Sequence, residues 1–373
     1  MDNKESHTIM HVINGLAVGG VENLALQLLH HSPERLDHIL VNLNPESVEM
    51  LPQFQEISKL KIINQPYQRS HKIQFILNLA KTIRAYQPQA ILAYPFGLHV
   101  FVGLAARISF YPSPNVRATP QNPPPTNPDV RYQWKNIVLA SRFLQIPLHC
   151  CSQAVEAEFQ TFTKLPEGSF PIPNACNVEE IAKRSEKTRK QRVIFPGKTI
   201  VGMVARLNTI KDQETLIRAC HIVRKTHPNL ELWLIGDGDK RTELEQLTIE
   251  LELQDVVKFW GNRNDVPELL GQMDVYTFST TPNEGFGIAV AEAMAASLPI
   301  VASDVPACRE VLAEGEAGLL VPPKNPEALA TTLNQLLASE EQRTRCGERA
   351  FQHSLSQYTS QVCAKQWYQV LLN

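Results

Sequence analysis

Short apolar runs alternate with amphipathic helical patterns along the first 120 residues, and this alternation limits the possible folds most strongly. Residues 9–13 are typical of a buried strand, residues 14–20 form a glycine turn, and residues 21–30 have helical spacing. The order then repeats, with strands expected at 38–43, 90–93 and 115–119 and helices expected at 73–86 and 100–108. Strands and helices in alternation form parallel sheets covered by helices on both faces. The sequence therefore predicts an α/β fold that begins with a Rossmann-like unit.

The first glycine turn does not have the spacing of a dinucleotide site. Gly15 is followed by Gly19 and Gly20, which differs from the G-x-G-x-x-G arrangement that holds a pyrophosphate. In open parallel sheets, ligands bind beyond the carboxyl ends of the strands. The loops at 94–99 and 120–129 follow predicted strands, so we expect them to line a binding site.

Composition indicates a globular chain of about two domains. The 373 residues are 43% hydrophobic and 20% charged. The seven cysteines have no regular spacing, which argues against a disulfide framework. No run reaches the roughly 20 apolar residues of a membrane span, and the amino terminus lacks the apolar core of a signal peptide. We therefore expect a cytoplasmic protein, and the net charge of −2 gives no reason to expect nucleic acid as a partner.

The charge is distributed unevenly along the chain. Residues 1–180 hold 14 Lys or Arg and 14 Asp or Glu, whereas residues 181–200 hold seven basic residues and one acidic residue. The basic run from Lys183 to Arg192 is either a solvated linker or a weak contact for the inner face of an anionic membrane. The neutrality of the first 180 residues indicates that such a membrane contact would be transient.

Residues 284–295 place two carboxylates eight positions apart at an expected helix start. Glu284 stands in a glycine-rich turn, and Glu292 stands in an alanine-rich run of high helix propensity. A helix should begin near Gly287, and the free N–H groups of its first turn would form an anion site. Gly285 and Gly287 lack a Cβ atom, so the backbone can approach a ligand closely. The stretch suits a phosphorylated ligand with hydroxyl groups, although by itself it could also be an ordinary acidic helix start.

The residues around this pair resemble the nucleotide-sugar half of glycosyltransferase family 4, whose members are retaining enzymes of the GT-B fold. The resemblance is strong over residues 202–326 and weaker over the amino-terminal half. Besides the E-x7-E pattern, it rests on three flanking stretches, at residues 266–276, 298–304 and 318–323. It implies two Rossmann-like domains whose parallel sheets face a central cleft. The expected parts are an acceptor domain at 1–180, a linker at 181–198, a donor domain at 199–355 and a last helix at 356–373 that crosses back to the first domain.

Arg206 and Lys211 resemble the family's pair of cations that grip the donor pyrophosphate. Elementary chemistry agrees, because a leaving nucleoside diphosphate gains negative charge that fixed cations stabilise. Arginine adds a bidentate fork and lysine a compact point charge. The resemblance further implies that Glu284 holds sugar hydroxyls and orients the anomeric carbon, and that Glu292 holds the ribose hydroxyls. Three of these residues, Arg206, Lys211 and Glu284, are the predicted catalytic residues. The expected donor-binding residues are Gly19, Gly20, Arg206, Lys211, Gly236, Arg263, Glu284, Gly285, Phe286, Gly287, Ile288 and Glu292.

The amino-terminal half is expected to hold the acceptor. Residues 19–22 resemble the family's Gly-Gly-x-Glu loop, which lies across the cleft from the donor phosphates. The proline-rich loop at 120–129 should be extended and shape the acceptor pocket. Many members carry a catalytic histidine on this loop, but here Gln121 and Asn122 occupy the position, so that role cannot be transferred and no general base is named. The expected acceptor-binding residues are Tyr94, His99, Gln121 and Asn122.

The resemblance implies transfer of a hexose from a nucleotide sugar, with retention, to a glycan or lipid-linked saccharide in polysaccharide or glycoconjugate biosynthesis. UDP-glucose or UDP-N-acetylglucosamine is favoured as the donor by family frequency. No cofactor is expected besides this co-substrate, and no metal, because two cations and a helix end would take its place. The alternatives are a nucleotide-sugar 2-epimerase or a phosphorylase on the same fold, or a non-catalytic nucleotide-sugar-binding protein. The oligomeric state stays open.

Overall fold

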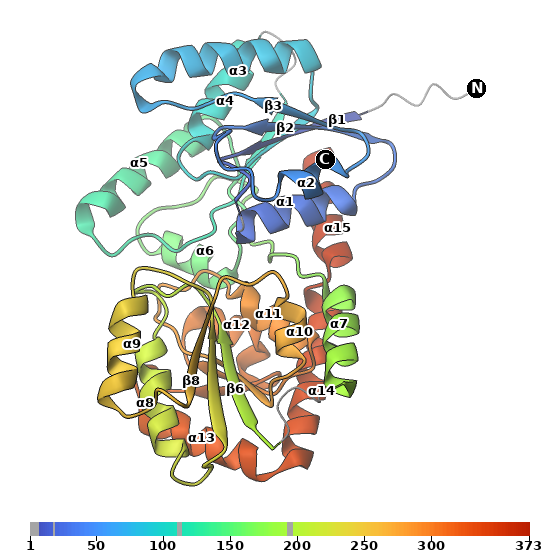
Figure 1. Cartoon of the computed structure of the whole chain (residues 1–373). Helices are drawn as coiled ribbons and strands as arrows, with labels where there is room; N and C mark the ends of the chain where they lie inside the picture. The colour runs from blue at the N-terminus through green and yellow to red at the C-terminus, as the bar shows by residue number, and fades with distance from the viewer. Residues whose placement is uncertain (1–6, 18, 110–113, 192–196) are drawn as a thin grey trace. The chain divides into compact units, whose positions relative to one another are not determined.

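The computed structural model describes residues 7–17, 19–109, 114–191 and 197–373 (Figure 1). The chain divides into two compact units, one made of Met1–Ala175 together with Ser360–Asn373 and the other of Cys176–Thr359. Each unit contains one parallel sheet. No helix in the described part of the chain is both long enough and apolar enough to span a membrane.

The first unit is built on five parallel strands in the order β3-β2-β1-β4-β5. The strands are β1 (His7–Ile13), β2 (Leu36–Asn42), β3 (Leu60–Asn64), β4 (Ala90–Ala93) and β5 (Asn115–Ala118). The helices are α1 (Gly20–His30), α2 (Leu51–Gln55), α3 (Lys72–Tyr86), α4 (His99–Ile108), α5 (Pro128–Phe143), α6 (Gln153–Gln160) and α15 (Ser360–Leu372), with a short 3₁₀ turn, η1 (Arg69–His71). Figure 1 shows α3 and α4 on one face of this sheet and α1 on the other.

The C-terminal helix α15 is part of the core of the first unit. Trp367 is fully buried, and the Tyr368 hydroxyl donates to the carbonyl of Leu28 at 2.7 Å. Ser360 donates to the side-chain oxygen of Gln27 at 2.7 Å. The chain therefore returns to the first unit at residue 360, after α14, whereas the sequence prediction places a single last helix at 356–373.

The second unit is built on six parallel strands in the order β11-β10-β9-β6-β7-β8. The strands are β6 (Thr199–Val204), β7 (Leu230–Ile235), β8 (Val257–Gly261), β9 (Val275–Phe278), β10 (Ile300–Ser303) and β11 (Leu319–Val321). The helices are α7 (Val178–Lys190), α8 (Gln213–Val223), α9 (Arg241–Glu250), α10 (Val266–Leu270), α11 (Ile288–Ala295), α12 (Pro306–Val311), α13 (Pro326–Ala338) and α14 (Glu340–Gln357), with the 3₁₀ turn η2 (Ala313–Gly315). Helices α8, α9 and α13 lie on one side of the sheet, and α7, α10, α11 and α14 lie on the other (Figure 1).

The basic stretch that the sequence suggests as a linker is mostly a packed helix of the second unit. Asn177 caps α7 by accepting the N–H of Glu180 at 3.3 Å, and the basic residues gather in its last turn, where the helix dipole favours them. Arg184 makes two hydrogen bonds to the Glu268 carboxylate, at 2.8 and 2.7 Å, which tie α7 to α10. The linker prediction is therefore wrong for residues 181–190, and Arg192 lies outside the described residues.

Candidate functional site

The order of strands in the second sheet reverses between β6 and β9, which are neighbours although two strands separate them in the chain. Open parallel sheets bind ligands at such a reversal, beyond the carboxyl ends of the strands. The loop after β6 carries Arg206 and Lys211, and the loop after β9 carries Glu284. An isolated antiparallel bridge between Lys211 and Thr280 joins the two loops. Three predicted catalytic residues thus lie on the two loops that meet at this reversal.

Lys211 and Glu284 form an ion pair between Nζ and Oε2. Only 15% of the lysine side chain and 9% of the glutamate side chain are exposed. Thr280 Oγ1 lies 3.1 Å from the same carboxylate oxygen, and the Gly285 N–H donates to the other oxygen at 3.2 Å. Lys211 Nζ also lies 4.5 Å from the centre of the Phe278 ring, within the range of a cation–π contact. Both charges are therefore held in fixed positions by partners, as burial of charged groups requires.

Arg206 differs from Lys211 because its side chain is exposed. Its guanidinium forms no hydrogen bond or ion pair with any described residue, while its carbonyl accepts from Gln213 Nε2 at 3.0 Å. The loop after β6 is thereby anchored through its backbone. The structure leaves one cation of the predicted pair free and places the other against a carboxylate.

Gly236 and Gly238 let the loop after β7 pack directly on the loop that carries Arg206. Gly236 has a φ of +128°, and a Cβ atom there would lie 2.2 Å from the carbonyl oxygen of Ala205. A Cβ atom on Gly238 would lie 2.1 Å from the carbonyl oxygen of Leu207. Both glycines are therefore required by packing alone, independently of the donor contact predicted for Gly236.

Helix α11 begins at Ile288, directly after Gly287, so the predicted helix start is confirmed. Gly287 has φ +83° and ψ +53°, a left-handed conformation that glycine adopts at the lowest cost. No side chain caps this end of α11. The first-turn N–H groups of an uncapped helix are available to an anion.

Glu292 lies half-buried on α11, and burial raises its pKa to about 7. Its carboxylate accepts no hydrogen bond from another described residue. Its negative charge raises the pKa of Cys176, whose thiol is already held neutral by burial. The carboxyl oxygens of Glu292 can thus still accept hydrogen bonds, and part of the residue is exposed.

Two other predicted donor residues have different surroundings from those expected. Phe286 is buried, and its ring stands edge-on to Tyr358 with centroids 5.4 Å apart, so it is a core residue and offers no side-chain contact to a ligand. Arg263, in the loop after β8, pairs with Asp265 at 2.6 Å and stacks over Trp260. No hydrogen bond or ion pair joins its side chain to Lys211 or Glu284 in the described structure. Ile288 is half-buried at the start of α11.

Comparison with known proteins identifies the second unit. Residues 184–353 match the model of the family described as glycosyl transferases group 1. The match covers slightly less than half of the chain. It extends from α7 to α14 and includes the candidate site residues of the second unit, which are Arg206, Lys211, Gly236, Arg263 and those in 284–292.

Curated relatives match over the same half of the chain. An exopolysaccharide phosphotransferase of Streptomyces coelicolor is 34% identical over 199 residues, which are 52% of this chain and 20% of that protein. A phosphatidyl-myo-inositol mannosyltransferase of Mycobacterium leprae is 33% identical over 184 residues, 48% of this chain and 47% of that protein. The chain spans about half or less of the length of these two relatives.

Solved structures match along nearly the whole chain. The Anabaena protein HepE, in complex with UDP and glucose, has a TM-score of 0.83 and 20% identity, and the match covers 98% of this chain and 99% of that one. A glycosyltransferase from Rickettsia africae has a TM-score of 0.81 and 17% identity, covering 99% of this chain and 100% of that one. The chain has the GT-B fold predicted from the sequence, with one parallel sheet in each unit.

The predicted acceptor residues Tyr94 and His99 lie inside the first unit. The Tyr94 hydroxyl lies 2.9 Å from Nδ1 of His11, and Tyr94 is 3% exposed. His99 is fully buried, accepts the N–H of Gly97 at Nδ1 and contacts Ser141 Oγ through Nε2 at 2.8 Å. Burial lowers the pKa of His99 to about 4, which keeps the imidazole neutral. Both predictions are wrong in this respect, because core side chains with internal partners offer no surface to an acceptor.

Gln121 and Asn122 follow β5, and they differ in exposure. Gln121 is half-buried between Thr119, to which it donates at 2.7 Å, and Asn174, from which it accepts at 2.8 Å. Asn122 is exposed and has no hydrogen-bond partner among the described residues. The proline-rich loop contains no helix or strand from Pro120 to Asn127. The Asn127 side chain caps α5, so Pro128 and Asp129, which the sequence places in the loop, are helical.

Gly19 and Gly20 begin α1 at the corresponding reversal of the first sheet, where β1 neighbours β4. Gly19 is extended, and a Cβ atom there would lie 2.5 Å from the Glu22 carboxylate, whereas a Cβ atom on Gly20 would meet open space.

Thr280, in contact with Glu284, is a residue that the sequence does not single out, since only the sheet order brings it beside Lys211.

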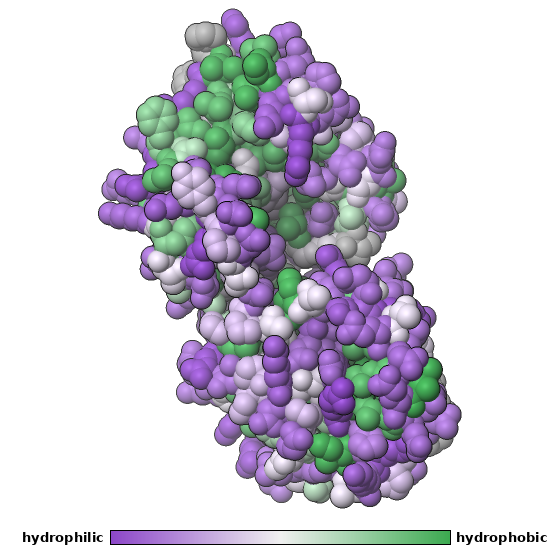
Figure 2. All heavy atoms as spheres, turned by 90° about the vertical axis from the view of Figure 1, so that its left-hand side faces the viewer, coloured by the Kyte–Doolittle hydropathy of each residue, from purple (hydrophilic) through white to green (hydrophobic). Residues whose placement is uncertain are grey.

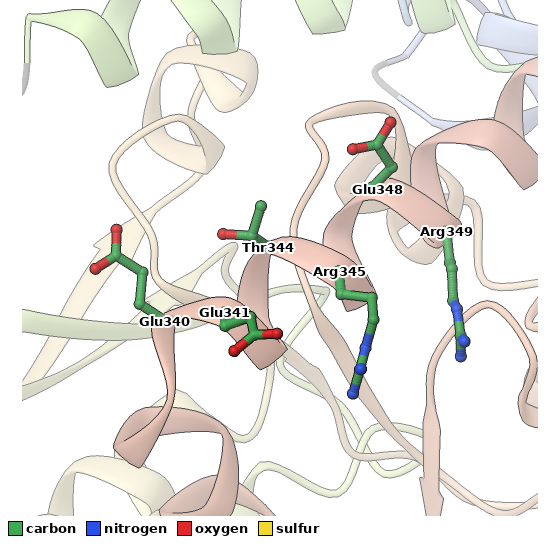
Figure 3. A pocket seen from close by; sticks show the side chains of 6 residues that line it. All are labelled: Glu340, Glu341, Thr344, Arg345, Glu348 and Arg349. Atoms are coloured by element: carbon green, nitrogen blue, oxygen red, sulfur yellow. The ribbon is translucent and has the colours of Figure 1, made fainter.

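A hollow of about 620 Å³ lies on α14, away from these residues. Figure 3 shows that its six lining side chains all project from this one helix: Glu340, Glu341, Thr344, Arg345, Glu348 and Arg349. Such an open surface has no opposing wall and lacks the enclosure of a ligand pocket.

Proposed function

We propose that this chain transfers a hexose from a nucleotide sugar to a glycan or lipid-linked saccharide, with retention at the anomeric carbon and without a metal ion. The observation that carries the proposal is the meeting of Lys211, Glu284 and Arg206 on the two loops at the reversal of the second sheet. The matched segment of the group-1 family supports it.

In this proposal the two cations bind the donor diphosphate together with the uncapped start of α11. Arg206 is exposed and unpaired, so its fork is free to hold two phosphate oxygens. Lys211 supplies a point charge that is already fixed in position. A fixed charge stabilises the leaving diphosphate without reorganisation at the moment of reaction.

The ion pair gives Glu284 a different partner before and after the donor binds. Before the donor binds, Glu284 neutralises Lys211 and avoids an unpaired buried charge. A diphosphate that takes over the ammonium group leaves the Glu284 carboxylate free to accept hydrogen bonds from the sugar hydroxyls. Thr280 and the Gly285 N–H keep the carboxylate oriented during this exchange.

Glu292 is proposed to accept hydrogen bonds from the two ribose hydroxyls. Its carboxylate has no described partner, so the acceptor sites needed for two hydroxyl donors are available. Hydrogen bonds donated to a carboxylate favour its charged form, so donor binding should lower the pKa of Glu292 from about 7 and release a proton.

The transfer breaks the bond between the anomeric carbon and the diphosphate oxygen and forms a bond to the acceptor oxygen on the same face. The leaving oxygen takes the acceptor proton, so no residue of the chain is assigned as general base. UDP-glucose or UDP-N-acetylglucosamine is the proposed donor, and the Anabaena neighbour, solved with UDP and glucose, supports the uridine choice. The Mycobacterium leprae relative is named for phosphatidyl-myo-inositol, which supports an acceptor carried on a lipid.

Incubation of the full chain with UDP-glucose and a panel of glycan and lipid-linked acceptors tests the proposal. NMR of the product should show the anomeric configuration of the donor. Epimerised donor in the absence of acceptor would indicate a 2-epimerase, and sugar phosphate formed with inorganic phosphate would indicate a phosphorylase. Donor binding without any product, across the panel, would instead indicate a nucleotide-sugar-binding protein.

A further inference from the structure

Three helices of the first unit expose large apolar side chains, and these define what we call the α3–α5 face. Phe143 is 80% exposed and Ile73 is 77% exposed, values unusual for such large side chains. Apolar side chains gather on the visible surface of the first unit in Figure 2, with hydrophilic ones around them. The apolar residues of the face are Ile73 and Leu77 on α3, Leu104 and Ile108 on α4, and Leu139 and Phe143 on α5.

These residues form stripes on helices that pack side by side. Each pair is four positions apart, which places both members on one side of their helix. Helix α4 packs against α3 and also against α5. Arg107, near the end of α4, lies 3.5 Å from the carbonyl of Phe143 through Nη2, so the ends of α4 and α5 are adjacent.

The same helices carry positive charge with almost no acidic counterpart. Residues 57–155 contain eleven Lys or Arg and a single acidic residue, Asp129. The neutral total of residues 1–180 hides this because the acidic residues lie in the flanking segments. Six cations are exposed on the three helices and form no ion pair with a carboxylate in the described part of the chain: Lys72, Lys81, Arg84, Arg107, Lys135 and Arg142.

We propose that the α3–α5 face docks this protein onto the surface of an anionic lipid bilayer. Apolar side chains would enter the boundary between headgroups and acyl chains, and the cations would contact lipid phosphates. A second copy of the chain fits less well, since a two-fold contact would set two copies of this positively charged face against each other. Nucleic acid would attract the cations but leave Phe143 and Ile73 in water.

This surface replaces the basic run of α7 as the membrane contact. Arg184 pairs with Glu180 and Glu268, and Lys190 pairs with Glu186, so two of the cations on α7 are already engaged. The α3–α5 face offers cations that have no carboxylate partner among the described residues, together with apolar side chains. Its binding to lipid does not depend on the sugar transfer proposed above.

Co-sedimentation of the full chain with phosphatidylcholine vesicles, with and without phosphatidylglycerol, tests the proposal. We expect binding to the vesicles that contain phosphatidylglycerol. Phe143→Ser should weaken this binding about tenfold, because a large apolar side chain no longer leaves water. Ile249→Ser, which removes a 51%-exposed side chain from α9 of the second unit, is the matched control and should leave binding unchanged.

A second pair of variants tests the charge. Lys81→Gln should weaken binding to the anionic vesicles about fivefold, as expected for one basic residue at such a surface, whereas Lys225→Gln on the second unit should not. Transfer to a water-soluble acceptor, measured without vesicles, should be the same in all four variants, which separates docking from catalysis.

Three results would overturn the proposal. The first is absence of binding to both kinds of vesicle. The second is loss of binding in Lys81→Gln with full affinity in Phe143→Ser, which would indicate a general attraction to polyanions. The third is a dimer in gel filtration that Phe143→Ser dissociates, without vesicle binding, which would assign the face to a second copy.

Discussion

Replacement of Lys211 by alanine tests two contributions of the Lys211–Glu284 pair. One is to the stability of the second unit, and the other is to catalysis. Among the described residues, the substitution leaves the Glu284 carboxylate, 9% exposed, with Thr280 and the Gly285 N–H as its hydrogen-bond partners. Removal of one member of a buried pair costs about 3–5 kcal/mol. For a unit of this size such a loss lowers the melting temperature by roughly 10 °C.

The effect on catalysis should be larger than the loss of folded protein explains. Loss of one group that stabilises transition-state charge lowers turnover about 10²–10³-fold, so we expect that decrease for Lys211→Ala at a temperature where the variant is fully folded. The matched variant is the double substitution Lys211→Ala and Glu284→Gln, in which no unpaired charge remains. The double variant should regain most of the melting temperature that Lys211→Ala loses relative to the wild type. Its turnover should stay at or below that of the single variant.

Turnover at saturating donor, measured beside thermal unfolding by circular dichroism, checks both expectations. Near-normal turnover in Lys211→Ala would refute the assignment of this lysine to the diphosphate. Equal melting temperatures for wild type and Lys211→Ala would refute the view that Glu284 depends on Lys211 for its charge.

Four further expectations concern ligands and pH. Burial raises the pKa of Glu292 to about 7, and hydrogen bonds from the donor hydroxyls favour the charged carboxylate. Donor affinity should therefore rise with pH up to about 7 and level off above it. Titration calorimetry should find no such pH dependence in Glu292→Gln. Activity should persist in EDTA, and a loss that Mg²⁺ or Mn²⁺ restores would contradict metal independence. UDP at 100 times its dissociation constant should stabilise the protein by about 2.7 kcal/mol in thermal shift, and stabilisation by GDP alone would exclude a UDP donor. Asn122→Ala should weaken transfer to acceptor while slow donor hydrolysis persists, since an exposed amide positions a hydroxyl but cannot act as a base; equal loss of both reactions would remove Asn122 from the acceptor site.

The sequence predicts the strands and helices whose apolar residues recur at one regular spacing. It also predicts the helix that begins after Gly287. It misses α14, an 18-residue helix with mostly charged residues on its exposed surface, because few apolar positions mark its buried side. It also treats the basic run of α7 as solvated, since nothing local shows that Glu268, 84 positions away, will pair with Arg184. Interactions between distant residues decide these cases.

The candidate site shows the same limit. The pattern of residues 206–211 and 284–292 identifies the cations and carboxylates, but not that Lys211 and Glu284 pair directly or that Thr280 joins them. The sequence predicts Tyr94 and His99 near a ligand because they follow strand β4. Their side chains instead point into the core, and side-chain direction at a strand end is set by packing that the local sequence does not encode.

The place of α15 in the core of the first unit has a consequence for synthesis on the ribosome. Trp367 and Tyr368 complete an apolar cluster formed with residues of α1 and β4, yet they are translated about 190 residues after Ala175, the last earlier residue of that unit. The second unit is continuous and can fold as soon as it emerges. The first unit is completed only after the second, so its nascent cluster stays open to water, and to chaperones, until α15 has been synthesised.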